Sequence, residues 1–429
     1  MIIQFNFKNY KSFRNEVTLD MTATKMTELQ NHVANIGNDK LLKIAAIYGA
    51  NAAGKSNIYE AFGYMSYYVY ASFKFGGDSE SKQIDKEKYP KVTPFIFDEN
   101  AKKEPTTFEV FFIDNEDSMQ KTYQYGFSLL QNSVEEEWLY VKSKSARDYK
   151  TIFYRKSGEK IDFTGIKKGA ENIELSLEKE TLIVSLGAKL KISQLKKVRD
   201  WFVKNEMVDF GDPFENLLRS KTLPSNFTDD REVQNKVVEY FSTFDGSIKG
   251  FRVETDDASS DNEDDKGVKI DALHRNNEGE LISIPLQKES SGTLKMFALY
   301  PPIQEVLNNG STLFVDELNA RLHPLLVRNI ILAFTNPEIN RNNAQLIFTT
   351  HDIWQISNDF LRRDEIWFVE KDIDTGISDL YSLADFSDED GTKIRKDEAY
   401  SKNYLLGKYG AIPHLKSLNL LKGDMYGEK

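Results

Sequence analysis

Eight consecutive residues carry the clearest chemistry in the sequence. They are Gly49, Ala50, Asn51, Ala52, Ala53, Gly54, Lys55 and Ser56, and Asn57 then begins a helix-like run that reaches residue 65. Because an apolar, strand-like run at 41–48 precedes them, the G-x-x-x-x-G-K-S spacing predicts a phosphate cradle. The glycines and backbone N–H groups admit phosphate oxygens, Lys55 reaches the β/γ-phosphates, and the Ser56 hydroxyl ligates Mg²⁺.

A pair of acidic residues ends a second strand-like run. Residues 312–315 are apolar or β-branched, and Asp316 and Glu317 follow them directly. Beside a phosphate cradle, the first carboxylate would help to hold Mg²⁺, and the second would orient and deprotonate an attacking water. We therefore take Asp316 as a candidate metal ligand and Glu317 as the candidate general base.

Two further features could complete such a site. The strand-like run 345–350 ends at His351, which could contact the γ-phosphate or the attacking water. Ser290, Ser291 and Gly292 open an apolar helix, where small residues form either an anion site or an ordinary helix cap. His323 precedes Pro324 and is expected to begin a helix, because proline favours the first helical turn.

The elements that position these residues follow from the periodicity. Strand-helix alternation in the last third predicts a parallel or mixed sheet with its ligands at the carboxyl ends of the strands. Residues 1–160 read as a lobe with the phosphate loop and an antiparallel β region, because short aromatic and β-branched runs recur there. We expect a helical insertion at 165–250, a second ATPase lobe at 251–390 and a C-terminal extension at 391–429. Loops are expected at 76–89 and in the acidic run Asp256–Asp265.

Composition excludes several classes of protein. The chain has 429 residues and no cysteine, which rules out disulfides, thiolate zinc sites and cysteine nucleophiles. We found no basic leader and no stretch of about eighteen apolar residues, so we expect a cytoplasmic protein without a membrane span. The net charge of −11 argues against a surface built for nucleic acid, although 142–168 is locally basic.

The order of these motifs resembles the ABC/SMC class of ATPase heads. The resemblance is closest to the bacterial RloA/AbiLi-type ATPases, a group similar to the ATPase halves of OLD-family nucleases and to the ATPase of the PARIS phage-defence system. The stretches that carry it are Tyr48–Ala61, Glu289–Leu299, Val315–Val327, Gln345–Asp352, Arg363–Lys371 and Asn403–Pro413. It implies an α/β fold, a P-loop NTPase head of the ABC/SMC type with an antiparallel β subdomain and a helical insertion.

The resemblance also implies roles for individual residues. Lys55 and Ser56 correspond to Walker A, Asp316 and Glu317 to Walker B, 290–293 to the signature loop, 319–322 to the D-loop and His351 to the switch histidine. Lys11 and Ser12 correspond to an early loop near the adenine in related heads. The signature departs from the usual Leu-Ser-Gly-Gly-Gln, and we place no Q-loop glutamine.

Two functions remain open at this point. The resemblance implies ATP sandwiched between two heads, and an ATPase that depends on Mg²⁺ and acts as a homodimer or larger homo-oligomer. Such a switch would control a TOPRIM-class, nuclease-like effector in abortive infection and would respond to a phage-derived trigger. We expect the effector to be a separate chain, because the roughly forty residues after Asp390 are too few for such a nuclease domain. The alternative is an SMC/RecF-like ATPase acting on DNA in repair, which the basic stretch at 142–168 favours and the net charge opposes.

Overall fold

A computed structural model describes residues 1–75, 90–114, 120–219, 224, 226–242, 246–255, 268–387, 391 and 393–413. The expected loops at 76–89 and Asp256–Asp265 and the last sixteen residues of the expected C-terminal extension lie outside this range. No helix in the described part of the chain is long and apolar enough to cross a membrane.

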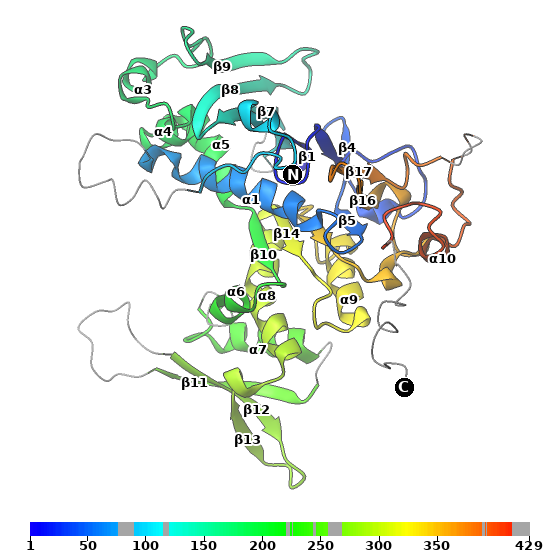
Figure 1. Cartoon of the computed structure of the whole chain (residues 1–429). Coiled ribbons are helices and arrows are strands. Elements are labelled where there is room, and N and C mark those ends of the chain that lie inside the picture. Colours follow the sequence, from blue (N-terminus) through cyan, green and yellow to red (C-terminus); the bar gives the residue numbers. More distant parts are fainter. Residues whose placement is uncertain are drawn as a thin grey trace, which may run out of the picture.

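A six-stranded central sheet organises the molecule (Figure 1). Its strands, in spatial order, are β10 (Glu206–Asp209), β14 (Thr312–Asp316), β15 (Gln345–Thr349), β5 (Ile44–Gly49), β16 (Ile366–Lys371) and β17 (Ser378–Ser382). All neighbouring pairs are parallel except β16 and β17. The predicted strands that end at the phosphate loop, the acid pair and His351 are therefore neighbours, and their carboxyl ends share one edge.

A second six-stranded sheet is wholly antiparallel. Its strands are β2 (Val17–Asp20), β1 (Ile2–Lys8), β6 (Thr106–Ile113), β7 (Thr122–Leu130), β8 (Ser133–Lys142) and β9 (Lys150–Lys156). In Figure 1 this antiparallel sheet lies at the top of the view and the central sheet lies in the middle. Together with the parallel strands, it confirms the predicted mixed α/β fold with antiparallel β structure.

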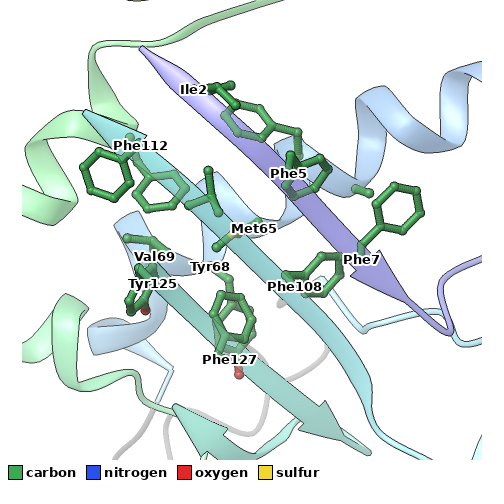
Figure 2. Close-up of a cluster of buried hydrophobic side chains, with 14 of the residues drawn as sticks. Ile2, Phe5, Phe7, Met65, Tyr68, Val69, Phe108, Phe112, Tyr125 and Phe127 are labelled. Atoms are coloured by element: carbon green, nitrogen blue, oxygen red, sulfur yellow. The ribbon is translucent and has the colours of Figure 1, made fainter. Parts of the chain in front are cut away.

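Helix α1 (Lys55–Ala71) packs between the two large sheets. Figure 2 shows Met65, Tyr68 and Val69 of this helix beside aromatic side chains of β1, β6 and β7. The same core includes Ala45 and Ile47 of β5. Three helices close this side, and Trp201 of the third stacks on Phe112 with ring centroids 4.0 Å apart. They are α3 (Ala170–Ser176), α4 (Ile183–Lys189) and α5 (Ser193–Val203).

The opposite face of the central sheet has a core of its own. Successive side chains of a strand point to opposite faces, so Ile44, Ala46 and Tyr48 of β5 belong to this second core. Several helices complete this side, together with a three-stranded sheet that projects at the bottom of Figure 1. The elements are α6 (Pro213–Arg219), α7 (Arg231–Ser242), β11 (Ile248–Thr255), β12 (Val268–Arg275), β13 (Leu281–Pro285), α8 (Ser291–Asn309), α9 (Pro324–Thr335) and α10 (Tyr400–Leu405).

Two local predictions differ from the structure. The run 41–48 is not one strand: β4 (Asp39–Leu42) pairs with β3 (Val33–Ile36), and β5 begins only at Ile44. The range 165–250 contains helices, as expected, but also β10, which pairs with β14 at the edge of the central sheet. Four residues are too few to show a period, and their partner lies about a hundred residues away in the sequence, so pattern alone could not reveal this strand.

Candidate functional site

The phosphate loop connects β5 to α1 and depends on its two glycines. A Cβ at Gly49 would lie 2.4 Å from the carbonyl oxygen of Val369 on the neighbouring strand β16. Gly54 has φ +115°, and a Cβ there would lie 2.7 Å from Oγ of Ser12 and 2.8 Å from Oγ of Ser378. Any larger residue would push the loop away from these neighbours, so the glycines set its path.

Lys55 begins α1 and folds back onto this loop. Its Nζ donates to the carbonyl oxygens of Gly49 at 2.9 Å and Ala50 at 3.0 Å, and the residue is buried. Burial lowers the pKa of Lys55, while the Asp316 and Glu317 carboxylates act in the opposite direction. The ammonium therefore lies within electrostatic reach of the acid pair.

The residues around Lys55 differ in exposure. Ser56 is exposed, as are Asn51 and Ala52 in the loop, and Ala52 has φ +62°. Asn57 donates from Nδ2 to Oγ of Ser12 at 2.7 Å. The Ser56 hydroxyl is thus accessible, whereas Asn57 is used to hold the loop.

The early loop that contains Lys11 and Ser12 contacts the segment around the phosphate loop. Ser12 is buried and accepts the bond from Asn57, and Ser378 donates from Oγ to Oγ of Ser12 at 2.8 Å and to the Ala53 carbonyl at 2.6 Å as alternative partners. Lys11 pairs with Glu60 on α1. Sequence reasoning missed Ser378, because it follows a turn more than 300 residues downstream and belongs to no recognisable motif.

The acid pair stands at the carboxyl end of β14. Asp316 is buried, and its Oδ1 accepts a hydrogen bond from Oγ1 of Thr349 on the adjacent strand β15. The backbone N–H of Glu317 donates to the same hydroxyl at 2.9 Å. Glu317 has φ +52°, which is uncommon for a residue with a side chain and often marks a functional position. Thr349 therefore fixes both acidic residues relative to β15.

A third carboxylate joins this edge. Asp209 ends β10 directly beside Asp316 in the register of the sheet. Burial raises the pKa of Asp209, and the Asp316 carboxylate adds to the shift. A Cβ at Gly211 would lie 3.0 Å from Oδ1 of Asp209 and 3.3 Å from Oε2 of Glu317, so both carboxylates flank this glycine. Asp209 was missed because its strand was missed.

His351 contacts the predicted D-loop of its own chain. Nδ2 of Asn319 lies 3.1 Å from Nε2 of His351, and Oδ1 of Asn319 accepts from Oγ1 of Thr350 at 2.8 Å. His351 itself is exposed. Asn319 therefore holds the histidine ring next to the loop that follows the acid pair.

The Ser290–Gly292 segment caps the helix α8. Oγ of Ser290 accepts from the backbone N–H of Thr293 at 3.1 Å, which is a standard N-cap bond. Ser290 and Ser291 are exposed. One turn into the helix, buried Lys295 donates from Nζ to the carbonyls of Phe210 at 2.7 Å and Ala320 at 3.0 Å. The helix is thereby tied to the segments that follow β10 and β14, a link that no motif had indicated.

A large cavity of about 1730 Å³ extends along the phosphate loop. Gly49 to Ala53 line one side together with His351, and the turn 372–377 and part of the end segment 404–413 line others. Arg14, Phe95, Phe97 and Asp98 form a further wall. The cavity thus joins the loop to His351, whereas Lys55, Ser56, the acid pair and Ser290–Gly292 do not line it.

Burial is the main influence on the pKa of Lys295, which lies near the acid pair. Lys295 lies beside Glu317 and Asp209, yet burial lowers its pKa to about 8, and Arg321 contributes in the same direction. No cluster of three or more His, Asp or Glu side chains in the described ranges is arranged to hold a metal ion. A hard divalent cation would therefore need oxygen ligands from elsewhere, such as phosphate groups.

A family model described as "AAA domain, putative AbiEii toxin, Type IV TA system" matches residues 44–353. No curated protein matches the chain.

Among solved structures, three Smc heads are similar. One is bound to the C-winged helix domain of ScpA, at 15% identity and TM-score 0.40, over 92% of this chain and 99% of the other. A second, from Pyrococcus furiosus with an extended coiled coil, is bound to the C-terminal domain of ScpA, at 14% identity and TM-score 0.36, over 89% and 96%. The third is from Pyrococcus yayanosii, with a coiled coil and joint, at 13% identity and TM-score 0.37, over 89% and 97%.

Proposed function

The chain belongs to the family described as "AAA domain, putative AbiEii toxin, Type IV TA system", and we propose that it is an ATPase switch in which ATP joins two copies of the chain. The observation that carries this proposal is the state of Lys55. Its buried ammonium is held by two loop carbonyls and lies within reach of the acid pair. A bound triphosphate would replace these carbonyls as the partner of the ammonium.

The donor groups at the edge of the central sheet suit Mg²⁺. Magnesium in ATPases is commonly held by one or two protein oxygens together with phosphate oxygens. Here the exposed hydroxyl of Ser56 and the carboxylate of Asp316 would provide the protein oxygens. The ion would neutralise charge that develops on the phosphates during hydrolysis.

Glu317 is the proposed general base. Its backbone has an unusual conformation and donates to Thr349, and the residue directly follows Asp316, the proposed metal ligand. His351, positioned by Asn319, would contact the γ-phosphate or the attacking water from the cavity side. These two residues would act on the water, whereas Lys55 would bind the phosphates.

A second copy of the chain would complete the site. Ser290 and Ser291 are exposed at the start of α8 and do not line the cavity next to the phosphate loop of their own chain. A helix N-terminus with exposed hydroxyl-bearing residues attracts an anion. In a pair of chains, each signature loop would therefore contact the phosphates held by the other.

The wider role extends the proposal. We place the chain with the RloA/AbiLi-type ATPases of bacterial phage defence, in which ATP binding and hydrolysis would control a separate effector. The family description names a toxin and a type IV toxin-antitoxin system, which supports a defence role without naming the effector. The effector we expect is a TOPRIM-class nuclease in another chain.

The substitution Glu317→Gln tests the enzymatic part. It keeps the shape of the side chain and removes the base, so we expect ATP to bind normally while hydrolysis falls about 10²- to 10³-fold. Native mass measurements should show Glu317→Gln accumulating as a dimer or larger particle in ATP. The native mass of Lys55→Ala should be the same with ATP as without it. Hydrolysis at the wild-type rate by Glu317→Gln would show that another group is the base.

A further inference from the structure

The cavity wall that includes Arg14, Phe95, Phe97 and Asp98 contains an exposed aromatic side chain. Phe97 lines the cavity and leaves 60% of its surface exposed, whereas its neighbour Phe95, which also lines the cavity, is buried. Isolated exposed apolar residues are common on protein surfaces. Phe97 is unusual because it shares a cavity with a phosphate loop.

The ring of Phe97 is held firmly in place. Its centroid lies 5.6 Å from that of Phe95, whose backbone N–H donates to Oδ1 of Asn9 at 3.1 Å. On another side it contacts the turn 372–377, where a Cβ at Gly376 would lie 2.8 Å from the ring. Nζ of Lys371 lies 5.3 Å from the ring centroid. The ring is therefore positioned before any ligand arrives.

The same turn is anchored to the phosphate loop. It connects β16 to β17, and Val369 of β16 pairs with Gly49 at the start of the loop. At the other end of the turn, Ser378 donates to the Ala53 carbonyl. The position of Phe97 relative to the phosphate loop is thus fixed through one hairpin. Ile373 at the tip of that hairpin also lines the cavity and is 72% exposed.

We propose that Phe97, together with Ile373, forms the platform that binds the base of the nucleoside triphosphate. This inference rests on the proposed function, because it takes the phosphate loop as the site of the phosphates. A ligand with phosphate groups at one end and a flat apolar ring at the other would fit the two sides of this cavity. Stacking on an aromatic side chain accepts any base, since every base has a π-face.

Arg14 and Asp98, the charged groups on the same wall of the cavity, are already paired. Nε of Arg14 donates to Oδ2 of Asp98 at 3.1 Å, and the rest of the guanidinium bonds to Glu104. These groups hold the wall in place instead of reading the edge of a base. Phe97 would therefore contribute affinity and little discrimination between ATP and GTP.

Calorimetric titration with ATP and with inorganic tripolyphosphate tests the platform. Phe97→Ala should weaken ATP binding about tenfold, the loss expected for one stacked base, and leave tripolyphosphate binding within about twofold. GTP binding should weaken by a similar factor. Ile96→Ala is the matched control, because Ile96 is the adjacent residue and is 56% exposed but does not line the cavity. It should change neither titration.

A gain of signal provides an independent check. Phe97→Trp should preserve ATP binding, and stacking of the base should quench the fluorescence of the added tryptophan with ATP but not with tripolyphosphate. Ile96→Trp should show no such difference beyond that of the natural tryptophans.

The outcomes separate the two proposals. If ATP binds in a Lys55-dependent manner but Phe97→Ala has no effect, or weakens both ligands equally, the platform is wrong and the phosphate site stands. If Phe97→Ala instead changes only the native mass in ATP, the residue contacts a second copy and the platform is also wrong. Absence of Lys55-dependent ATP binding overturns both.

Discussion

Two helices of this protein, α1 and α8, begin at the two candidate phosphate-contacting segments and lie on opposite faces of the central sheet. At the start of α1, Lys55 is buried, and the preceding loop lines a cavity formed by its own chain. The start of α8 presents Ser290 and Ser291 to solvent and lines no part of that cavity. The proposed shared site requires this difference, because one end would hold a ligand within the chain and the other would meet a ligand held by another copy.

The interiors behind the two helices also differ. Helix α1 packs in an aromatic core against the antiparallel sheet, as Figure 2 shows. Helix α8 packs with α7 and α9 and is tied to the central sheet by the polar contacts of Lys295. Damage behind α1 should therefore affect folding, whereas damage at the Lys295 contacts should affect the coupling between the signature loop and the acid pair.

The effect on activity is expected at Lys295. Lys295→Met keeps the aliphatic part of the side chain but leaves the carbonyls of Phe210 and Ala320 without their donor. We expect ATP hydrolysis and ATP-dependent association to fall about tenfold, a cost of about 1.4 kcal/mol, while ATP binding to the single chain is unchanged. Parallel measurements of affinity, rate and native mass will separate these effects.

Lys288→Met is the control for that experiment. Lys288 is an exposed lysine shortly before α8, so its loss removes a charge near the signature loop without touching the two carbonyls. An equal loss of activity in both variants would mean that charge, and not the link made by Lys295, is responsible.

The second effect is a pH dependence of stability behind α1. Glu137 is buried and accepts hydrogen bonds from the hydroxyl of Tyr125 at 3.0 Å and from the backbone N–H groups of Ile183 at 2.6 Å and Val184 at 3.1 Å. Burial raises its pKa to about 7, although Arg155 opposes the shift. The folded chain thus keeps this proton at a pH where the unfolded chain has lost it.

The sign of the effect follows from this difference. Between about pH 4.5 and pH 7 the unfolded state binds fewer protons, so the free energy of unfolding should decrease as pH rises, by up to about 3 kcal/mol from this group. Glu137→Gln cannot ionise and should remove that slope. Urea unfolding of both proteins at several pH values measures it. Parallel pH profiles would contradict the assignment, and ATP affinity at pH 7 serves as a check that the site is intact.

Local sequence patterns were sufficient to predict the elements that carry the phosphate loop and the acid pair. A buried strand, the glycine spacing and the lysine identify β5 and the start of α1, and the acid pair ends β14 where expected. His323 accepts from the backbone N–H of Leu325 and begins α9, as the following proline predicted. Each of these features is encoded within about ten residues, because capping and loop chemistry act over short distances.

Contacts between distant segments were not predictable. Asp209 depends on a four-residue edge strand that pairs with β14, Ser378 reaches the phosphate loop through a hairpin, and Lys295 meets carbonyls from two other segments. None of these residues carries a local pattern that distinguishes it from ordinary surface or core residues. The roles assigned to Lys11, Ser12 and the signature loop likewise remain predictions.

The central claim is that each ATP site is shared between two chains, and mixing two inactive variants tests it directly. Lys55→Ala removes the ammonium group that is proposed to bind the phosphates. Gly292→Asp blocks the signature loop with a charge, in a position where a Cβ meets nothing closer than 3.6 Å and folding should be unaffected. If sites are shared, the mixture should regain roughly a quarter of the wild-type ATPase rate, because half of randomly paired dimers are mixed and each has one intact site. Mixing Lys55→Ala with the double variant should regain nothing. A mixture of the two single variants that shows only the sum of their separate rates would show that the site is contained within one chain.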